Sequence, residues 1–270
     1  MVMVNTPRSK PDCPPKLGRL VWPFQALAAA CPQLVAAVAG TFALGRARYE
    51  IPRFDFHGQP GGTPPIRLGL FALVHGDEPA GALGLQRLLE TLAADPAPAR
   101  GYELSLYPVC NPTGYEDGTR HNRAGLDLNR EFWRGSAQPE VQILEQELRT
   151  RGFDGIIALH ADDTSEGLYG YTQGRVLNEN LLVPALRASQ HVLPVNPSPV
   201  IDGFAAEQGI VEDCFPGILA PSPEQRPRPF EIIFETPAAA PMTHQVEAIG
   251  CALASVLAEY RGFIAQGANL

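Results

Sequence analysis

The stretch that decides the fold is "IRLGLFALVHGDEPAGALGLQRLLETLAA", residues 66–94. Its opening apolar run has the length and composition of a buried strand, and residues 78–94 have the leucine spacing of an amphipathic helix. The leucines of that expected inner face are Leu85, Leu88, Leu89 and Leu92. His75 and Glu78 stand between strand and helix. A His-x-x-Glu motif is common by chance, so its meaning depends on the rest of the chain.

The remaining sequence continues this alternation of apolar strands and helices. We expect strands at 34–40, 46–56, 102–109, 153–160 and 228–236, and helices at 24–33, 138–151 and 242–261. Several strands are apolar throughout, which is typical of a sheet buried on both faces. The sequence therefore predicts an α/β fold: a single domain with a mixed, mostly parallel, twisted β-sheet and helices on both faces. We expect residues 1–18 to be a flexible N-terminal arm and residues 19–270 to form one catalytic domain.

Composition excludes several classes of protein. The chain has 270 residues, 45% of them hydrophobic, which is enough material for a substantial core. Its net charge is -8 and its basic residues form no dense run, so nucleic-acid binding is not expected. Residues 20–45 carry no charge, but Pro23 and Pro32 interrupt them, which disfavours a membrane span. Five cysteines without Cys-x-x-Cys spacing indicate reduced thiols and a cytoplasmic protein.

Polar side chains follow the ends of four expected strands. They are His75, Asn111, His160 and Glu235. In open α/β sheets, ligands bind outside the carboxyl ends of the strands, so these residues are expected to meet. Two histidines and a glutamate are one attested ligand set for catalytic zinc. Glu78 at a helix start is also favoured as an anion. The alternative is a polar corner of the structure without a metal.

The segment "GTRHNRAGLDLNREFW", residues 118–133, concentrates arginines and amides and has little apolar periodicity. One interpretation is a plain solvated loop. The other is recognition of an anion, because a guanidinium binds a carboxylate through two parallel hydrogen bonds and a neighbouring amide can add another.

The motifs "HGDE", "GTRHNRAGLDLNREF", "ALH" and "FET" occur in this order. In order and approximate spacing they resemble the zinc carboxypeptidase family, most closely its small bacterial members, including murein-peptide amidases. The resemblance extends over roughly residues 20 to 260, and the combined pattern is more specific than any one motif.

The resemblance implies a zinc-dependent hydrolase with one Zn²⁺ per chain. The ligands would be His75, Glu78 and His160, a set known from carboxypeptidase A. Asp127 would accept a hydrogen bond from His75. Four further roles are implied: Asn129 and Arg130 would hold the terminal carboxylate of the substrate, Arg120 would stabilise the oxyanion, and Glu235 would be the general base and then the acid.

Two features of the family pattern have no clear counterpart. The larger digestive members have a mobile tyrosine before the catalytic glutamate, whereas no tyrosine lies between Tyr171 and Tyr260. Tyr169 or Tyr171 could enter the pocket instead, but we expect both to have packing roles. Residues 211–219 are a plausible pocket wall, in which Asp213 could select a cationic group; we expect it to be a solvent-exposed acid.

The remaining histidines have weaker claims to a role. His121 adjoins Arg120 and could touch the site, whereas His57, His191 and His244 are expected at the surface.

The favoured function is a metallocarboxypeptidase or amidase that cleaves an amide bond next to a free carboxylate. Its substrate would be a small peptide or an N-acyl amino acid. The first alternative is a deacylase of N-acyl amino acids, similar to aspartoacylase and succinylglutamate desuccinylase. Those enzymes usually add a β-rich domain after the catalytic glutamate, whereas 35 helical-looking residues follow Glu235 here. The second alternative is a non-catalytic peptide-binding protein, which would need no base at Glu235.

Overall fold

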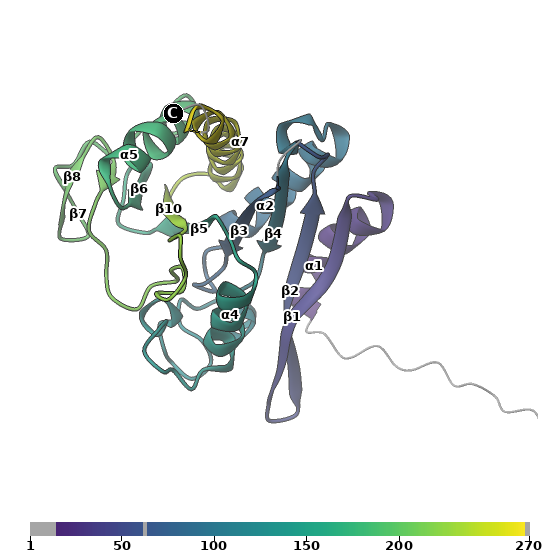
Figure 1. Ribbon diagram of the computed structural model, residues 1–270. Coiled ribbons are helices and arrows are strands. Elements are labelled where there is room, and N and C mark those ends of the chain that lie inside the picture. Colours follow the sequence, from purple (N-terminus) through teal and green to yellow (C-terminus); the bar gives the residue numbers. More distant parts are fainter. Residues whose placement is uncertain (1–14, 62–63, 268–270) are drawn as a thin grey trace, which may run out of the picture.

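A ten-stranded sheet forms the centre of the molecule, with helices on both of its faces (Figure 1). The computed structural model describes residues 15–61 and 64–267. The strands are β1 Leu34–Leu44, β2 Ala47–His57, β3 Ile66–Ala72, β4 Tyr102–Tyr107, β5 Gly155–Asp162, β6 Tyr169–Thr172, β7 Val200–Ile201, β8 Phe204–Glu207, β9 Ile210–Val211 and β10 Phe230–Pro237. The helices are α1 Pro15–Ala30, α2 Ala80–Ala94, α3 Pro112–Asp117, α4 Pro139–Thr150, α5 Arg175–Leu177, α6 Val183–Ser189 and α7 Met242–Gly267.

The strand order is β1-β2-β4-β3-β5-β10-β6-β9-β8-β7. The four central strands, β4, β3, β5 and β10, are parallel to their neighbours within this group. Strands β1 and β2 continue the sheet on one side by antiparallel pairing, and β6 pairs antiparallel with β10 on the other. The α/β fold with a mixed sheet is confirmed, with its parallel pairings concentrated at the centre.

Two layers of helix and loop cover the sheet. On one face, α1, α2, α6 and α7 bury a continuous core against the strands. On the other face, α4 packs over Phe71, Tyr107 and Phe153, and the loop segment 212–219 covers the region of β6 and β10. Because strand side chains alternate between faces, each central strand contributes apolar residues to both layers, as its continuous apolar sequence predicts.

The N-terminal part differs from the sequence prediction in its first helix and in the length of its first strand, which extends past residue 40 to Leu44. The helix expected at 24–33 begins at Pro15 and ends at Ala30, with Pro23 inside it. Burial of Leu17, Leu20 and Phe24 against the sheet offsets the cost of that proline. The first turn of α1 thus occupies the end of the arm expected at 1–18, and residues 1–14 lie outside the described residues.

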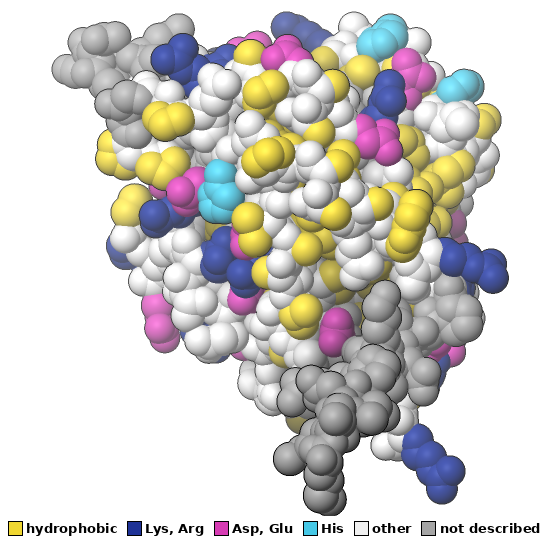
Figure 2. Space-filling view, turned by 90° about the vertical axis from the view of Figure 1, so that its right-hand side faces the viewer, with side chains coloured by type: hydrophobic (Ala, Val, Ile, Leu, Met, Phe, Trp, Pro, Cys, Tyr) yellow, Lys and Arg dark blue, Asp and Glu magenta, His cyan; other side chains and the backbone are white. Residues whose placement is uncertain are grey.

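The hairpin of β1 and β2 forms one edge of the sheet beside α1 (Figure 1). Figure 2 views the molecule from this side and shows hydrophobic side chains spread over the face. Exposed apolar residues of these elements include Trp22, Val35, Val38 and Leu44. Among the described helices, none has both the length and the apolar character that crossing a membrane requires.

Candidate active site

The carboxyl ends of β3, β5 and β10 bring together residues that are far apart in the sequence. In the parallel pairing of β5 with β10, His160 lies directly opposite Glu235. His75 follows the end of β3, which pairs with the other side of β5. The hydrogen bonding of the sheet therefore places His160 between the two other elements.

A sharp turn after β3 carries His75 and Glu78 into position. Leu73 adopts a left-handed backbone with φ of 53°, an arrangement that costs a non-glycine residue energy and clusters at functional sites. Gly76 packs against α3 so closely that a Cβ atom would lie 2.0 Å from the carbonyl carbon of Gly114. Asn111 caps α3 and donates from Nδ2 to the backbone oxygens of Val74 and Arg120. This turn therefore depends on a glycine and on the Asn111 side chain.

Three donor groups meet at this turn. The carboxylate of Glu78 bridges the two histidines: Oε1 lies 2.7 Å from His75 Nδ1, and Oε2 lies 2.9 Å from His160 Nδ1. The two Nδ1 atoms are 3.2 Å apart. All three side chains are buried, and their potential ligand atoms lie within 4.8 Å of one another.

These donors fit a metal ion. Zinc–nitrogen bonds of 2.0–2.1 Å at tetrahedral angles separate two ligand atoms by about 3.3 Å, close to the spacing of the two Nδ1 atoms. His75 Nε2 lies 3.1 Å from Asp127 Oδ1, which favours a proton on Nε2 and leaves a lone pair on Nδ1. A cation at the centre would satisfy this lone pair and the carboxylate of Glu78 together.

The electrostatics of the cluster favour an ionised Glu78 and a neutral His160. Burial opposes ionisation of Glu78, but His75 and His160 outweigh it and lower the pKa of this carboxyl to about 2. Burial lowers the pKa of His160, which favours the neutral imidazole that a metal requires. Burial also acts to lower the pKa of His75, but the neighbouring carboxylates of Glu78 and Asp127 outweigh it, so the net shift is upward. Glu78 is therefore an ionised carboxylate between the imidazole rings of His75 and His160.

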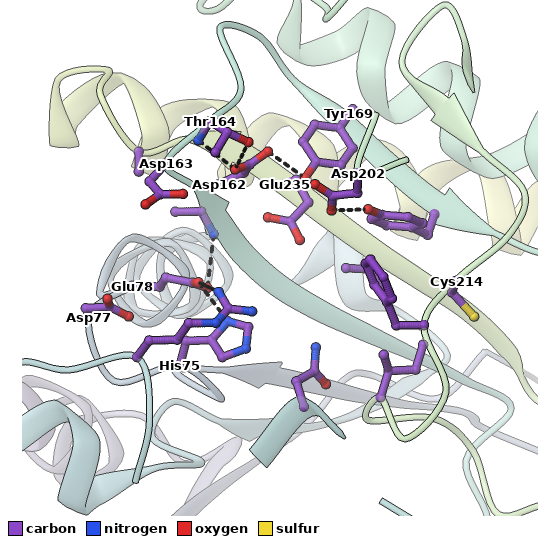
Figure 3. A pocket seen from close by; sticks show the side chains of 18 of the residues that line it. His75, Asp77, Glu78, Asp162, Asp163, Thr164, Tyr169, Asp202, Cys214 and Glu235 are labelled. Atoms are coloured by element: carbon purple, nitrogen blue, oxygen red, sulfur yellow. Dashed lines mark hydrogen bonds and ion pairs between the residues drawn. The ribbon is translucent and has the colours of Figure 1, made fainter. Parts of the chain in front are cut away.

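A cavity of about 410 Å³ opens beside the cluster. His75 and Glu78 lie on one side of it, and Glu235, Asp162 and Asp202 lie across from them (Figure 3). Arg120, Asn129 and Arg130 also line the cavity. The structure therefore brings two of the expected ligands, the expected base and the expected carboxylate-binding residues to one cavity, and the third ligand, His160, contacts the other two.

The arginine-rich segment forms an ordered wall of this cavity. Arg120 donates from Nε and Nη2 to Asp127 Oδ2 at 3.3 and 3.2 Å, and its Nη1 lies 3.5 Å from Glu78 Oε1. Its side chain is 42% exposed, so part of the guanidinium faces the cavity. Because Asp127 contacts both Arg120 and His75, it fixes the position of one relative to the other.

Asn129 and Arg130 are held by the loop segment 212–219. The backbone N–H of Leu219 donates to Asn129 Oδ1 at 2.8 Å, which leaves the Nδ2 group of Asn129 to donate elsewhere. The guanidinium of Arg130 stacks over the Phe215 ring at 4.2 Å and donates to the Asn129 backbone oxygen. The wall is therefore suited to an anionic group, as the sequence indicates.

Glu235 faces an acidic and aromatic wall. Burial and the nearby carboxylates of Glu78, Asp162 and Asp202 raise the pKa of Glu235 well above its ordinary value. Tyr169 donates to Asp162 at 2.9 Å, and Tyr171 donates to Asp202 at 2.6 Å. Both tyrosines have the packing roles expected for them in the apolar core, and both also line the cavity. They enter it because β6 pairs with β10 in a register that places Tyr169 beside Glu235.

Other residues lie where the sequence places them or outside the cavity. Asp213 is exposed, as expected, and Asn111 supports the turn without lining the cavity. His57, His191 and His244 are exposed, and His121 is exposed as well. Asp162, Asp163 and Asp202 line the cavity without having been expected there. Asp162 could have been suspected from its place at the end of a strand, whereas Asp202 has no such signal.

One segment of the chain matches a known sequence family. Residues 65–188 match the succinylglutamate desuccinylase/aspartoacylase catalytic domain. The match includes His75, Glu78, Arg120 and His160, and it ends before Glu235. It confirms the resemblance to the second of the two enzyme groups named above. No curated protein shows detectable similarity to the chain.

Solved structures provide the second comparison. A metallopeptidase candidate from Shewanella baltica OS155 is 24% identical, with a TM-score of 0.74 over 88% of this chain and 90% of that one. A metallo-carboxypeptidase from Burkholderia cenocepacia is 19% identical, with a TM-score of 0.70 over 94% and 70%. A succinylglutamate desuccinylase from Silicibacter sp. TM1040 is 17% identical, with a TM-score of 0.60 over 83% and 66%. Identities this low show the fold alone, and that fold is common to both groups.

Proposed function

We propose that the protein is a zinc-dependent hydrolase of an amide bond next to a free carboxylate. One observation supports this most strongly: a three-residue donor set adjoins a cavity that is lined by an unpaired carboxylate and an anion-binding wall. His75, Glu78 and His160 would hold one Zn²⁺. When bound, zinc polarises a carbonyl and lowers the pKa of water to about 7, so that hydroxide is available at neutral pH.

Glu235 is suited to proton transfer. It lies opposite His160 in the sheet and faces the cavity, and none of the described residues forms a hydrogen bond or ion pair with its carboxylate. We assign it the role of general base that accepts the proton of the attacking water. The same carboxyl then donates this proton to the leaving amine, because a group with a raised pKa serves as an acid near neutral pH.

The two arginines of the wall would bind two different negative charges of the substrate. Asn129 Nδ2 and Arg130 would bind the free carboxylate of the substrate and fix the scissile bond relative to the donor set. Arg120, held by Asp127 beside Glu78, would face the oxygen on which negative charge develops in the tetrahedral transition state. In this scheme Arg130 pairs with the substrate carboxylate, and Arg120 pairs with the oxygen of the transition state.

The carboxypeptidases and the deacylases differ in the acyl part of the substrate, which contains the carbonyl carbon that is attacked. In a carboxypeptidase it belongs to a peptide, and in a deacylase it belongs to a small acid. The matched segment favours a deacylase of N-acyl amino acids as the second candidate function. Both reactions release a residue with a free carboxylate, so the residue roles above apply to either.

Metal analysis and a substrate screen test the proposal together. Purified protein is expected to hold about one zinc per chain, and it should hydrolyse members of a panel of dipeptides, murein peptides and N-acyl amino acids. A chelator should abolish turnover, and added zinc should restore it. Measurable affinity for these compounds without any turnover by the zinc-loaded protein would instead indicate a binding protein.

Asp127→Asn is expected to weaken zinc binding by about 10- to 100-fold, because the carboxylate that orients His75 and raises its basicity is lost. Competition with a chromogenic chelator measures the affinity. Asp163→Asn is the matched control, since Asp163 lines the same cavity, is exposed and lies outside the donor set. Equal zinc affinity of the Asp127 variant and the wild type would contradict the role given to Asp127.

A further inference from the structure

A second, much smaller pocket adjoins the cavity. Tyr171, Cys214, Ile218 and Ile233 line both, so the two spaces share one wall. In Figure 3, Cys214 marks the side of the cavity remote from His75 and Glu78. The small pocket has a volume of about 10 Å³, which is the space of roughly one water-sized group.

Glu231 lies at this small pocket and has an unsatisfied oxygen. Side chains two residues apart on a strand share a face, so Glu231, Ile233 and Glu235 of β10 point to the same side of the sheet. The Oε1 atom of Glu231, which lines the pocket, is buried without a hydrogen-bond partner among the described residues. A buried acceptor without a partner is costly, so its presence calls for an explanation.

The protein itself offers Glu231 little compensation. Burial raises the pKa of Glu231 to about 7, and the charge of Arg228 offsets this only in part. The other residues that line the pocket include Tyr171, Cys214, the exposed Gln173 and the acid Glu212. None of these supplies a positive charge.

Two of the residues shared by the cavity and the small pocket, Ile218 and Ile233, are apolar. The segment that contains Ile218 also contacts the proposed carboxylate-binding residues. Ile218 adjoins Leu219, whose N–H holds Asn129, and Phe215 of the same segment stacks on Arg130. A residue whose carboxylate lies on Asn129 and Arg130 would therefore direct its side chain along Ile218 and Ile233. Glu231 lines the small pocket together with these two isoleucines.

We propose that the slot beside Glu231 receives the terminal ammonium of a linear side chain, carried by the residue whose free carboxylate binds Asn129 and Arg130. This inference rests on the proposed function and names the substrate class: a lysine-like residue with a hydrolysable amide on its α-nitrogen. The slot admits one water-sized group, which suits an ammonium better than a planar guanidinium. The ammonium would donate to Glu231 Oε1.

Three substrates that share one acyl group and end in lysine, norleucine or arginine test the inference. For the wild type, we expect kcat/KM to favour lysine over both of the others. Glu231→Gln keeps the side-chain shape and should lower the ratio of lysine to norleucine roughly 10- to 100-fold, the worth of a hydrogen bond to a charged group, with the loss in KM for lysine. A ratio unchanged by this substitution would overturn the inference.

Asp202→Asn is the matched control, because Asp202 is another acid of the cavity but is exposed and accepts from Tyr171. It should retain the preference for lysine; loss of the preference in this variant alone would assign the ammonium to Asp202 and overturn the inference. Calorimetry of the full chain with free lysine and free norleucine separates the two proposals. Absence of turnover on every substrate contradicts the proposed function, and lysine binding no tighter than norleucine contradicts the inference.

Discussion

Glu235→Gln is expected to lower kcat by about 100- to 10,000-fold, the range that a positioned acid–base group contributes. Glutamine has nearly the same shape as glutamate but cannot accept the proton of the attacking water or return it to the leaving amine. The site around it should persist, because Glu235 is not among the three converging donors and its strand is held by backbone pairing on both sides. Steady-state kinetics with the best substrate of the panel measures the effect.

Zinc content and substrate affinity should stay close to wild type in this variant. Glu166→Gln provides the control, since Glu166 is an exposed glutamate of the loop after β5. A Glu235→Gln protein that retains full kcat would remove the carboxyl from the mechanism. Loss of zinc together with loss of activity would instead assign Glu235 to the metal site.

His160→Gln should have the second large effect, a loss of the bound metal. His160 supplies one of the three donors that converge among the described residues, so its removal is expected to weaken zinc binding by more than the roughly 100-fold that loss of a supporting carboxylate costs. After dialysis against a weak chelator, zinc per chain should fall from about one to near zero, and activity should fall with it. Atomic absorption measures the metal directly.

His57→Gln is the matched control, since His57 is an exposed histidine at the end of β2. Circular dichroism of both variants checks that the fold is retained. If the His160 variant keeps its zinc and its activity, the donor set proposed for this site is wrong.

The sequence predicts the central strands and the converging residues because their signals are local. His75 and Glu78 stand between a buried strand and a helix, and His160 and Glu235 each end an apolar run, so the rule that parallel strands meet at one edge brings them together. The register of β5 with β10, which sets His160 opposite Glu235, is not local and does not follow from burial, because both strands are apolar on both faces.

The other wall of the cavity could not be predicted in the same way. Asp202 lies in the turn between β7 and β8, strands of two and four residues that are too short to leave a periodic pattern. Tyr171 reaches the cavity only because β6 pairs antiparallel with β10, a contact between distant segments. The start of α1 at Pro15 could not be predicted, because a proline such as Pro23 disfavours a helix interior. In the folded chain, burial of the residues around Pro23 outweighs this local preference.

The pairing of Glu235 with His160 limits how this chain can vary in length. Adding or deleting one residue within β10 ahead of Glu235 would turn its carboxyl to the opposite face of the sheet, into the apolar layer that now holds Phe234. The loop at 220–229 can absorb such a change before the strand begins. Insertions and deletions among homologous chains are therefore expected in that loop and excluded from the strand that follows it.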